Sequence, residues 1–281
     1  MRRLQDAFGE YYTVEHDRTE LDASNFIRLK AAVQRKHGMT GRQLGMTDFT
    51  SMIVAVTNTA PACYWMVHYI FSRPQLADQI RNEVSRIVAR RGEEAVCTIN
   101  VSHVEAECPL FTSCYKEMIR LMTGFVVTRT AMEDITVSDS HGRAYLLKKG
   151  VVVQVPFALL LQSKSAWGDD ANQFDPERFL RRGHSGGDME KARRLAYFPF
   201  SSGRHLCPGR NFAFLEIAVV LVTLLVGFEV NDTGKGWNGV EAAPAAFGTS
   251  ILKPAKDGEG QGIAVTRRQG WETVKWRYRY G

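Results

Sequence analysis

One stretch of the sequence, residues 197–210, constrains the fold more than any other. It reads YFPFSSGRHLCPGR and leads directly into a long apolar run. The run predicts a helix, and Pro208 suits its first turn because the amides there have no partner within the helix. Free amides and the helix dipole favour negative charge, so the thiolate of Cys207 would be stabilised here. Gly203 and Gly209 permit a positive φ or the close approach of a flat, bulky group.

Taken alone, a cysteine in front of a helix is more often a packing residue than a ligand. The spacing changes this interpretation, because Phe200-x-x-Gly203-x-x-x-Cys207-x-Gly209 resembles the haem-binding loop of the cytochromes P-450. The resemblance implies that the cofactor is haem b, that Cys207 is the axial ligand of its iron, and that Phe200, Gly203 and Gly209 shape the haem contact. It also implies that His205 binds a haem propionate, by a hydrogen bond more than by charge if the imidazole is neutral.

Composition narrows the classes of protein that need to be considered. With 281 residues, of which 44% are hydrophobic and 23% charged, the chain can bury a core as one large domain or two small ones. Its five cysteines contain no C-x-x-C pair, which argues against a disulfide framework and a zinc site. The net charge of +6 fits nucleic acid, an anionic membrane or an acidic protein. Because no basic and aromatic nucleic-acid motif occurs, we expect no nucleic-acid partner.

Two segments bear on membrane insertion. The first residues, 1–6, contain no apolar segment, so we expect neither a signal peptide nor an anchor in this chain. Residues 49–72 lack Asp, Glu, Lys and Arg and would pass a charge filter for a membrane span. Polar residues dilute this segment and Pro61 interrupts its middle, so we expect a buried central helix.

The middle of this central helix contains a candidate site. Pro61 offers no N–H to the preceding turn and leaves a carbonyl near residue 57 unpaired, so an opened turn with a Thr hydroxyl could hold water or O2. The alternative is a Thr bonded back to its own helix. The resemblance implies that the Thr59 hydroxyl helps to deliver protons to bound oxygen. Asn58 stands where the family has an acid, and an amide can orient water but cannot relay a proton as a carboxylic acid does.

Residues 58–65 look like one branch of the family, which contains the sterol 7α-hydroxylases and prostacyclin synthase. One of these oxygenates its substrate and the other rearranges a peroxide. The residues therefore leave both reaction types open.

Charged residues elsewhere match further positions of the family. Glu117 and Arg120 lie three residues apart on a predicted helix, a spacing that alone usually marks an exposed pair. The resemblance implies that they form a buried pair with Arg178 as third partner, a structural lock behind the haem. Arg129 follows a short β-like run, and the resemblance implies that it binds a haem propionate.

Periodicity and turn residues place the other elements. We expect helices at 22–36, 74–89 and 109–122 and a buried core segment at 217–227. We expect strands at 125–128, 135–137, 144–147 and 151–155, and strand-rich structure over 228–268 with a terminal hairpin at 248–254. The fold class is mainly α with small β-sheets (α+β), the C-terminal haem-binding part of the cytochrome P-450 fold, with a long central helix and a cysteine-loop helix. We expect one truncated domain, 1–281, with the strongest resemblance over 45–255.

Three functions remain open at this stage. The first is a haem-thiolate monooxygenase that oxidises a lipophilic small molecule with O2 and electrons from NADPH through a cytochrome reductase. The second is a haem-thiolate isomerase or dehydratase that acts on a peroxide, and the third is a truncated, non-catalytic remnant. For the first function we expect an apolar substrate pocket near Val54, Val126, Val127 and Phe247. The basic residues before the cysteine loop either form a docking surface for an acidic reductase or serve only solubility: Arg181, Arg182, Lys191, Arg193 and Arg194.

The resemblance also carries an expectation about location. A full-length form would sit at the endoplasmic reticulum membrane on its cytoplasmic face, held there by an N-terminal part that we do not find in this sequence. The C-terminal segment, 271–280, mixes aromatic and basic residues and receives no role.

Overall fold

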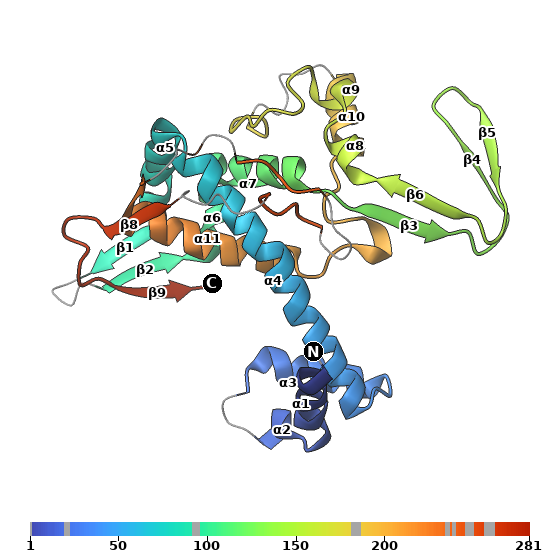
Figure 1. The fold of residues 1–281 in the computed structure, drawn as a ribbon, viewed down its shortest axis with the longest axis horizontal. Coiled ribbons are helices and arrows are strands. Elements are labelled where there is room, and N and C mark those ends of the chain that lie inside the picture. Colours follow the sequence, from blue (N-terminus) through green and yellow to red (C-terminus); the bar gives the residue numbers. More distant parts are fainter. Residues whose placement is uncertain are drawn as a thin grey trace. The chain divides into compact units, whose positions relative to one another are not determined.

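The structure, a computed structural model, describes residues 2–19, 23–91, 96–180, 187–233, 237, 240–244, 250–255 and 262–281 (Figure 1). Its helices are α1 Arg2–Thr13, α2 His16–Thr19, α3 Asn25–Lys36, α4 Gly41–Phe71, α5 Pro74–Val84, α6 Val104–Glu107, α7 Pro109–Met122, α8 Phe157–Leu161, α9 Lys164–Trp167, α10 Gly187–Ala196 and α11 Arg210–Gly227. Its strands are β1 Val88–Arg91, β2 Val96–Asn100, β3 Val126–Thr130, β4 Ile135–Ser138, β5 Ala144–Leu147, β6 Val152–Pro156, β7 Phe228–Asp232, β8 Ile263–Arg267 and β9 Lys275–Arg279. The predicted class, mainly α with small separate sheets, is confirmed.

The chain divides into two compact units, Met1–Asn58 and Thr59–Gly281, with the boundary inside α4. The first unit has a small apolar core of Tyr12, Ala31 and Leu44. At Gly45 a side chain would collide with the backbone of α1, so a glycine is needed for the close approach of α1 and α4.

Buried polar groups complete the first unit. Arg35 donates two hydrogen bonds to the buried carboxylate of Asp17, at 2.6 and 2.8 Å. Tyr12 and Lys30 both donate to Asp48. These pairs tie α1, α2 and α3 to the start of α4.

The predicted helix at 22–36 is present as α3, which begins at Asn25. Ser24 caps it by accepting a hydrogen bond from the amide of Ile27. The three apolar residues that recur at helical spacing, Phe26, Leu29 and Val33, are all exposed. Ala31 is the buried residue of this helix.

The predicted central helix begins eight residues earlier than expected, at Gly41 instead of residue 49. Thr40 and Gln43 form a reciprocal capping box: the Thr40 amide donates to Oε1 of Gln43 at 2.8 Å, and the Gln43 amide donates to Oγ1 of Thr40 at 3.4 Å. We had predicted that the helix begins only after the charged residues of this first part. The capping residues Thr40 and Gln43 instead determine where it starts. Beyond it, α4 continues through Pro61 to Phe71.

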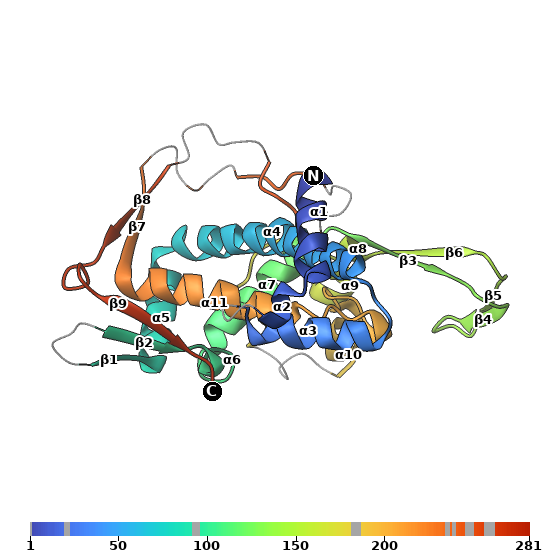
Figure 2. The ribbon, with the colours of Figure 1, turned by 90° about the horizontal axis from the view of Figure 1, so that it is seen from below.

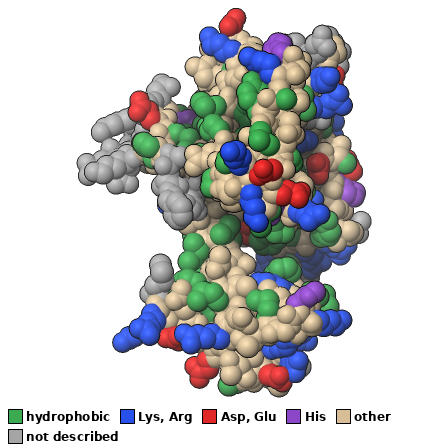
Figure 3. Space-filling view, turned by 90° about the vertical axis from the view of Figure 1, so that its right-hand side faces the viewer, with side chains coloured by type: hydrophobic (Ala, Val, Ile, Leu, Met, Phe, Trp, Pro, Cys, Tyr) green, Lys and Arg blue, Asp and Glu red, His purple; other side chains and the backbone are tan. Residues whose placement is uncertain are grey.

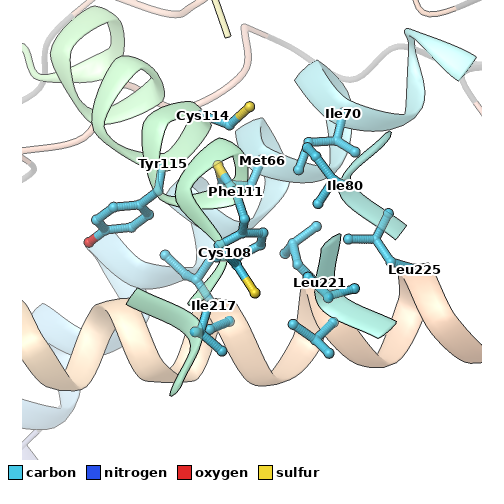
Figure 4. Packing of buried hydrophobic residues seen from close by; sticks show 14 of the residues in the cluster. Met66, Ile70, Ile80, Cys108, Phe111, Cys114, Tyr115, Ile217, Leu221 and Leu225 are labelled. Carbon is cyan, nitrogen blue, oxygen red and sulfur yellow. The ribbon is translucent and has the colours of Figure 1, made fainter. Parts of the chain in front are cut away.

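The core of the second unit lies between α4, α5, α7 and α11. Phe111 of α7 is fully buried and lies among side chains of the other helices, with Met66, Ile80 and Leu221 around it (Figure 4). The N-terminus of α7 is fixed by Glu83 of α5, whose carboxylate accepts hydrogen bonds from the amides of residues 110 and 111. Helix α7 has the predicted bounds.

The predicted helix at 74–89 is too long. Helix α5 ends at Val84, a 3₁₀ turn follows, and β1 takes the residues from Val88 onward into an antiparallel pair with β2. Arg81 ties α5 to the end of α11, because its Nε donates to the carbonyl of Leu225 at 2.7 Å. The third strand of this sheet is β9, which pairs in parallel with β2 (Figure 2).

The other sheets of the described residues have two strands each. Strands β3 and β6 pair in antiparallel register, and the strands predicted at 135–137 and 144–147 are present as β4 and β5, which pair as a hairpin. Several apolar residues of these strands are exposed, among them Val126, Ile135, Leu146 and Val152. Figure 3, viewed from the side of this hairpin, shows hydrophobic side chains at the surface among charged ones. The strand-rich segment after α11 contains β7 paired with β8, whereas residues 248 and 249 of the predicted terminal hairpin lie outside the described residues.

The predicted cysteine-loop helix is α11. It begins at Arg210 with Gly209 as N-cap, so Pro208 precedes the helix and does not occupy its first position. Among the described helices, α11 is the one long and apolar enough by composition to cross a membrane. One side of it supplies core residues such as Ile217, Leu221 and Leu225.

Candidate functional site

The loop before α11 holds Cys207 through its backbone. The Cys207 amide donates to the carbonyl of Phe200 at 2.9 Å, which closes the loop, and Arg210 Nη1 donates to the Cys207 carbonyl at 3.1 Å. Within the loop, Ser201 and Gly203 have positive φ values of 67° and 60°. The side chain of Cys207 is half-buried, so its sulfur remains accessible beside the start of the helix.

The space beside this sulfur fits a flat group. A Cβ atom at Gly203 would meet nothing within 4 Å, and one at Gly209 would meet only Sγ of Cys207, at 3.9 Å. Phe200 is half-buried and packs against the main core of the second unit. A single thiolate, open space at two glycines and an anchored aromatic residue match the needs of a haem, which takes one axial thiolate from the protein. Within the described ranges no three His, Cys, Asp or Glu side chains gather as a metal site.

Two cationic side chains were predicted to bind propionates. Arg129 lies within β3, not at its end, and its Nη2 donates to Oγ of Ser201 at 3.4 Å. This contact brings Arg129, 72 residues earlier in the chain, to the cysteine loop. His205 lies in the 3₁₀ turn Gly203–His205 and is exposed, and the described residues offer its side chain no hydrogen-bond or ion-pair partner. Both groups are available to an external carboxylate, and their propionate role stays a prediction.

The predicted buried network of Glu117, Arg120 and Arg178 is present. Glu117 and Arg120 are both buried, and Arg120 donates to both carboxylate oxygens of Glu117 at 2.7 and 2.9 Å. Arg178 donates to Oε1 of Glu117 at 2.9 Å and to Oδ2 of Asp170 at 3.0 Å. The hydrogen bond from Arg178 holds the pKa of Asp170 below its usual value. Carbonyls of residues 161 and 171 accept from Arg120 at 2.6 Å each, so α7 is tied to the segment that leads to the cysteine loop.

On the central helix, the polar residues at 57–59 make different bonds. Thr57 donates to the carbonyl of Ile53 at 2.9 Å, which is the back-bonded arrangement of an ordinary helical Thr. Asn58 Nδ2 donates to the carbonyl of Val54 at 3.0 Å. Thr59 does not follow this pattern, because its side chain hydrogen-bonds the carboxyl group of Glu216 on α11.

Glu216 is the functional candidate that our sequence reasoning missed. Its Oε2 atom is buried and has no hydrogen-bond partner among the described residues. Burial raises the pKa of the Glu216 carboxyl, and the hydrogen bond with Thr59 offsets only part of that rise. The sequence did carry a signal, since Glu216 is the one charged residue between Arg210 and Glu229 in an otherwise apolar helix.

Tyr115 of α7 is a second residue without an earlier prediction. Its hydroxyl is buried and has no partner in the described part of the chain, and it points away from the other labelled side chains of the core (Figure 4). Burial raises the pKa of the Tyr115 phenol, and the charge of Cys207 raises it further.

The residues of the predicted apolar pocket differ in exposure, and the pocket itself stays a prediction. Val54 and Val126 are exposed, Val127 is half-buried, and Phe247 lies outside the described residues. A cavity of about 380 Å³ in the first unit is lined by Ala7, Phe8, Tyr11, Tyr12, Ile27 and Asp48, and none of the predicted pocket residues lines it.

The predicted basic surface is only partly described. Residues 181 and 182 fall outside the described ranges. Arg193 donates to the carbonyl of Ala166 at 3.3 Å and lies over the ring of Trp167 at 6.0 Å. This arginine therefore has a structural role in packing α10 against α9.

Comparison with known proteins identifies the family. The family model "Cytochrome P450" matches residues 4–251. A cytochrome P450 monooxygenase of Gibberella zeae is 37% identical over 99% of this chain, and one of Hypoxylon pulicicidum is 30% identical over 99%. A 7-alpha-hydroxycholest-4-en-3-one 12-alpha-hydroxylase of Oryctolagus cuniculus is 24% identical over 91% of the chain. The chain spans about half the length of these relatives, 53%, 53% and 52% respectively.

Proposed function

The chain belongs to the cytochrome P450 family, and from this premise we propose that it acts as a haem-thiolate monooxygenase on a lipophilic small molecule. One observation carries the proposal: an accessible cysteine, fixed by its backbone at the start of α11, borders open space at Gly203 and Gly209. The names of the relatives specify monooxygenases and a hydroxylase, so the peroxide-rearranging alternative is not favoured.

Haem b is the cofactor that these residues fit. Bound through the Cys207 thiolate, it supplies an iron centre that activates O2 for insertion into a C–H bond. Phe200 holds the loop against the core, and Gly203 and Gly209 leave room for the ring. Arg129 and His205 bind the propionate groups by charge and by hydrogen bond.

Protons are supplied by the chain's own side chains. Asn58 holds and orients water through its amide but has no acidic proton to give. The Glu216 carboxyl lies within hydrogen-bond reach of Thr59 and keeps its proton to a higher pH than an exposed carboxyl, because burial penalises the ionised form. We place the proton on Glu216, from which it passes to the Thr59 hydroxyl oxygen as that hydroxyl gives up its own proton to the water that Asn58 orients.

We infer the source of the electrons and the cellular location from the family. We expect electrons from NADPH through a separate cytochrome reductase, although a relative from Oidiodendron maius is named a self-sufficient monooxygenase. The name of the rabbit relative specifies a cholestenone, which supports a lipophilic substrate class. A longer form would work at the endoplasmic reticulum membrane, on its cytoplasmic face.

Haem titration of the purified chain tests the proposal. We expect one haem per chain and, after reduction under CO, the red-shifted Soret band of a thiolate ligand. Cys207→Ala should lose this band, whereas Cys63→Ala, at the other half-buried cysteine, should keep it. A wild-type chain that folds but binds no haem would instead make this polypeptide a non-catalytic remnant. With haem bound, substrate oxidation that needs reductase and NADPH supports the monooxygenase.

A further inference from the structure

The segment that received no role from the sequence, 271–280, contains a well-anchored strand. Strand β9 lies beyond residue 251, where the match to the family model ends. It pairs with β2 over five residues, from Val96↔Lys275 to Asn100↔Arg279. The family match therefore says nothing about what this strand does.

The inner face of β9 fixes its position. The ring of Trp276 stacks on Trp271 at 5.5 Å, and it approaches Gly227 so closely that any side chain at 227 would collide with it. The hydroxyl of Tyr278 lies 3.1 Å from Oγ1 of Thr223 on α11. Trp276 and Tyr278, which point to the same face of β9, thus hold the strand against α11.

The outer face of β9 carries a row of positive charge. Strand residues alternate in direction, so Lys275, Arg277 and Arg279 point away from the face that Trp276 occupies. All three are exposed, and within the described residues none of their side chains forms a hydrogen bond or an ion pair. Alternate side chains on a strand repeat at about 6.6–6.8 Å, so the three charges form an evenly spaced line.

The backbone of β9 offers a second feature. The sheet order is β1-β2-β9, which places β9 at an edge, on the opposite side of β2 from β1 (Figures 1 and 2). In the described ranges no strand pairs with the outer side of β9. An edge strand presents a row of N–H and C=O groups that can accept another strand.

We propose that β9 is a docking edge for an extended acidic segment of a partner protein, which adds to the sheet as a fourth strand. A strand with Asp or Glu at alternate positions has the same repeat as the basic row, so each carboxylate can meet one cation while the backbone pairs along the edge. The same cations repel basic strands, including other copies of β9, and so keep the edge from pairing with copies of itself. The proposal does not rest on the monooxygenase function.

An acidic strand explains the geometry better than an anionic lipid surface does. Lipid headgroups would contact the charges but would leave the edge N–H and C=O groups without partners. An extended segment uses both features at once. The line of three charges along one strand also matches a linear partner more closely than a planar one.

Peptide binding to the full chain tests the proposal. The probe is a fluorescent peptide of alternating Glu and Thr, compared with one of the same composition whose glutamates form a block, and with one N-methylated at alternate amides. We expect the alternating peptide to bind at low salt. The blocked and methylated peptides should bind about tenfold more weakly or worse, because each breaks either the charge register or the backbone pairing.

Charge reversal on β9 gives the matched comparison. Arg277→Glu should weaken binding of the alternating peptide by about tenfold or more, while Lys148→Glu, an exposed lysine in the turn after β5, should leave it unchanged. Arg277→Gln removes the charge without reversing it, so it should weaken peptide binding by an intermediate amount. A graded effect of this kind separates loss of charge from misfolding. Equal binding of all three peptides, or equal effects of the 277 and 148 variants, would overturn the proposal. So would binding of phosphatidylserine vesicles, but not of the peptide, with the same dependence on residue 277.

Discussion

At the scale of single residues, Glu216 has the most unusual surroundings. A carboxyl group in an apolar helix, with one oxygen buried and unpaired, costs free energy unless the group stays protonated. Its one described hydrogen-bond partner is Thr59. Under the proposed function, Glu216 serves this threonine in place of the acid that the resemblance implies at position 58.

We expect Glu216→Gln to uncouple the haem-loaded protein. The variant keeps the shape and the contact with Thr59 but has no acidic proton, so electrons should be diverted from product to peroxide by roughly tenfold or more. The pH dependence of the free energy of unfolding gives a second measurement, made on the chain without haem. The native carboxyl holds its proton to a higher pH than the unfolded chain does, so the wild-type free energy of unfolding should fall as the pH rises through the native pKa. In Glu216→Gln this fall should be absent.

An exposed glutamate provides the control. Glu133→Gln removes a carboxylate from a surface loop and should change neither coupling nor the pH dependence of stability. If the 216 and 133 variants behave alike, Glu216 has no part in proton supply and Thr59 acts without it.

The cysteine loop was predictable from the sequence, whereas the contact between Thr59 and Glu216 and the contact of Arg129 with the loop were not. A fixed spacing of Phe200, Gly203, Cys207 and Gly209 identifies the loop without knowledge of the fold. The contact between Thr59 and Glu216 joins residues far apart in the chain, and an unpaired buried atom becomes visible only when the surrounding helices are in place. Arg129 was found through its place after a short β-like run, but its contact with the loop required the structure.

At the scale of elements, the network around Glu117 connects α7 to the chain that leads to the cysteine loop. We expect Glu117→Gln to destabilise the protein by about 3–5 kcal/mol, because it leaves Arg120 and Arg178 buried with a neutral partner. The urea midpoint, followed by tryptophan fluorescence to which Trp167 beside Arg120 contributes, measures this change.

The matched control is an exposed ion pair in the same region. Asp169→Asn also turns a carboxylate into an amide, in a pair with Lys164 that is open to solvent. It should leave the midpoint unchanged, since exposed pairs contribute little. A similar shift in both variants would mean that the burial of Glu117 does not set the cost.

Element boundaries show where local patterns stop being informative. Helix α7 has the predicted limits because Pro109 starts it and its apolar face is regular. Helix α5 is shorter than its periodicity predicts, because residues from Val88 on pair with β2, and β2 pairs in turn with a strand almost 180 residues later. Strand pairing over such separations leaves no periodic signal in either segment. The start of α4 did have a local signal, the capping residues Thr40 and Gln43, but the prediction used only the charge-free run that begins at residue 49.

At the scale of the whole molecule, the two compact units differ in what holds them. The second has a large core between α4, α5, α7 and α11, whereas the described part of the first has a small core cluster of Tyr12, Ala31 and Leu44 beside buried charged pairs. Arg35 lowers the pKa of Asp17 through its hydrogen bonds, against the opposing effect of burial. The Asp17 carboxylate therefore stabilises the first unit above its unfolded pKa near 3.8, and this contribution is lost as the pH falls through the lower folded pKa.

We therefore expect the first unit to open at a higher pH than the second on acidification. Hydrogen exchange read by mass spectrometry should show α1 and α3 losing protection while α7 keeps it. Asp17→Asn should expose α1 and α3 already at neutral pH, because Arg35 then lacks its charged partner. Glu15→Gln, which removes the exposed partner of Arg18, should not. If α3 and α7 lose protection at one common pH, the two units unfold together and the Asp17 pair is not the weak point. Separate transitions would show that buried charge, not apolar packing, limits the first unit.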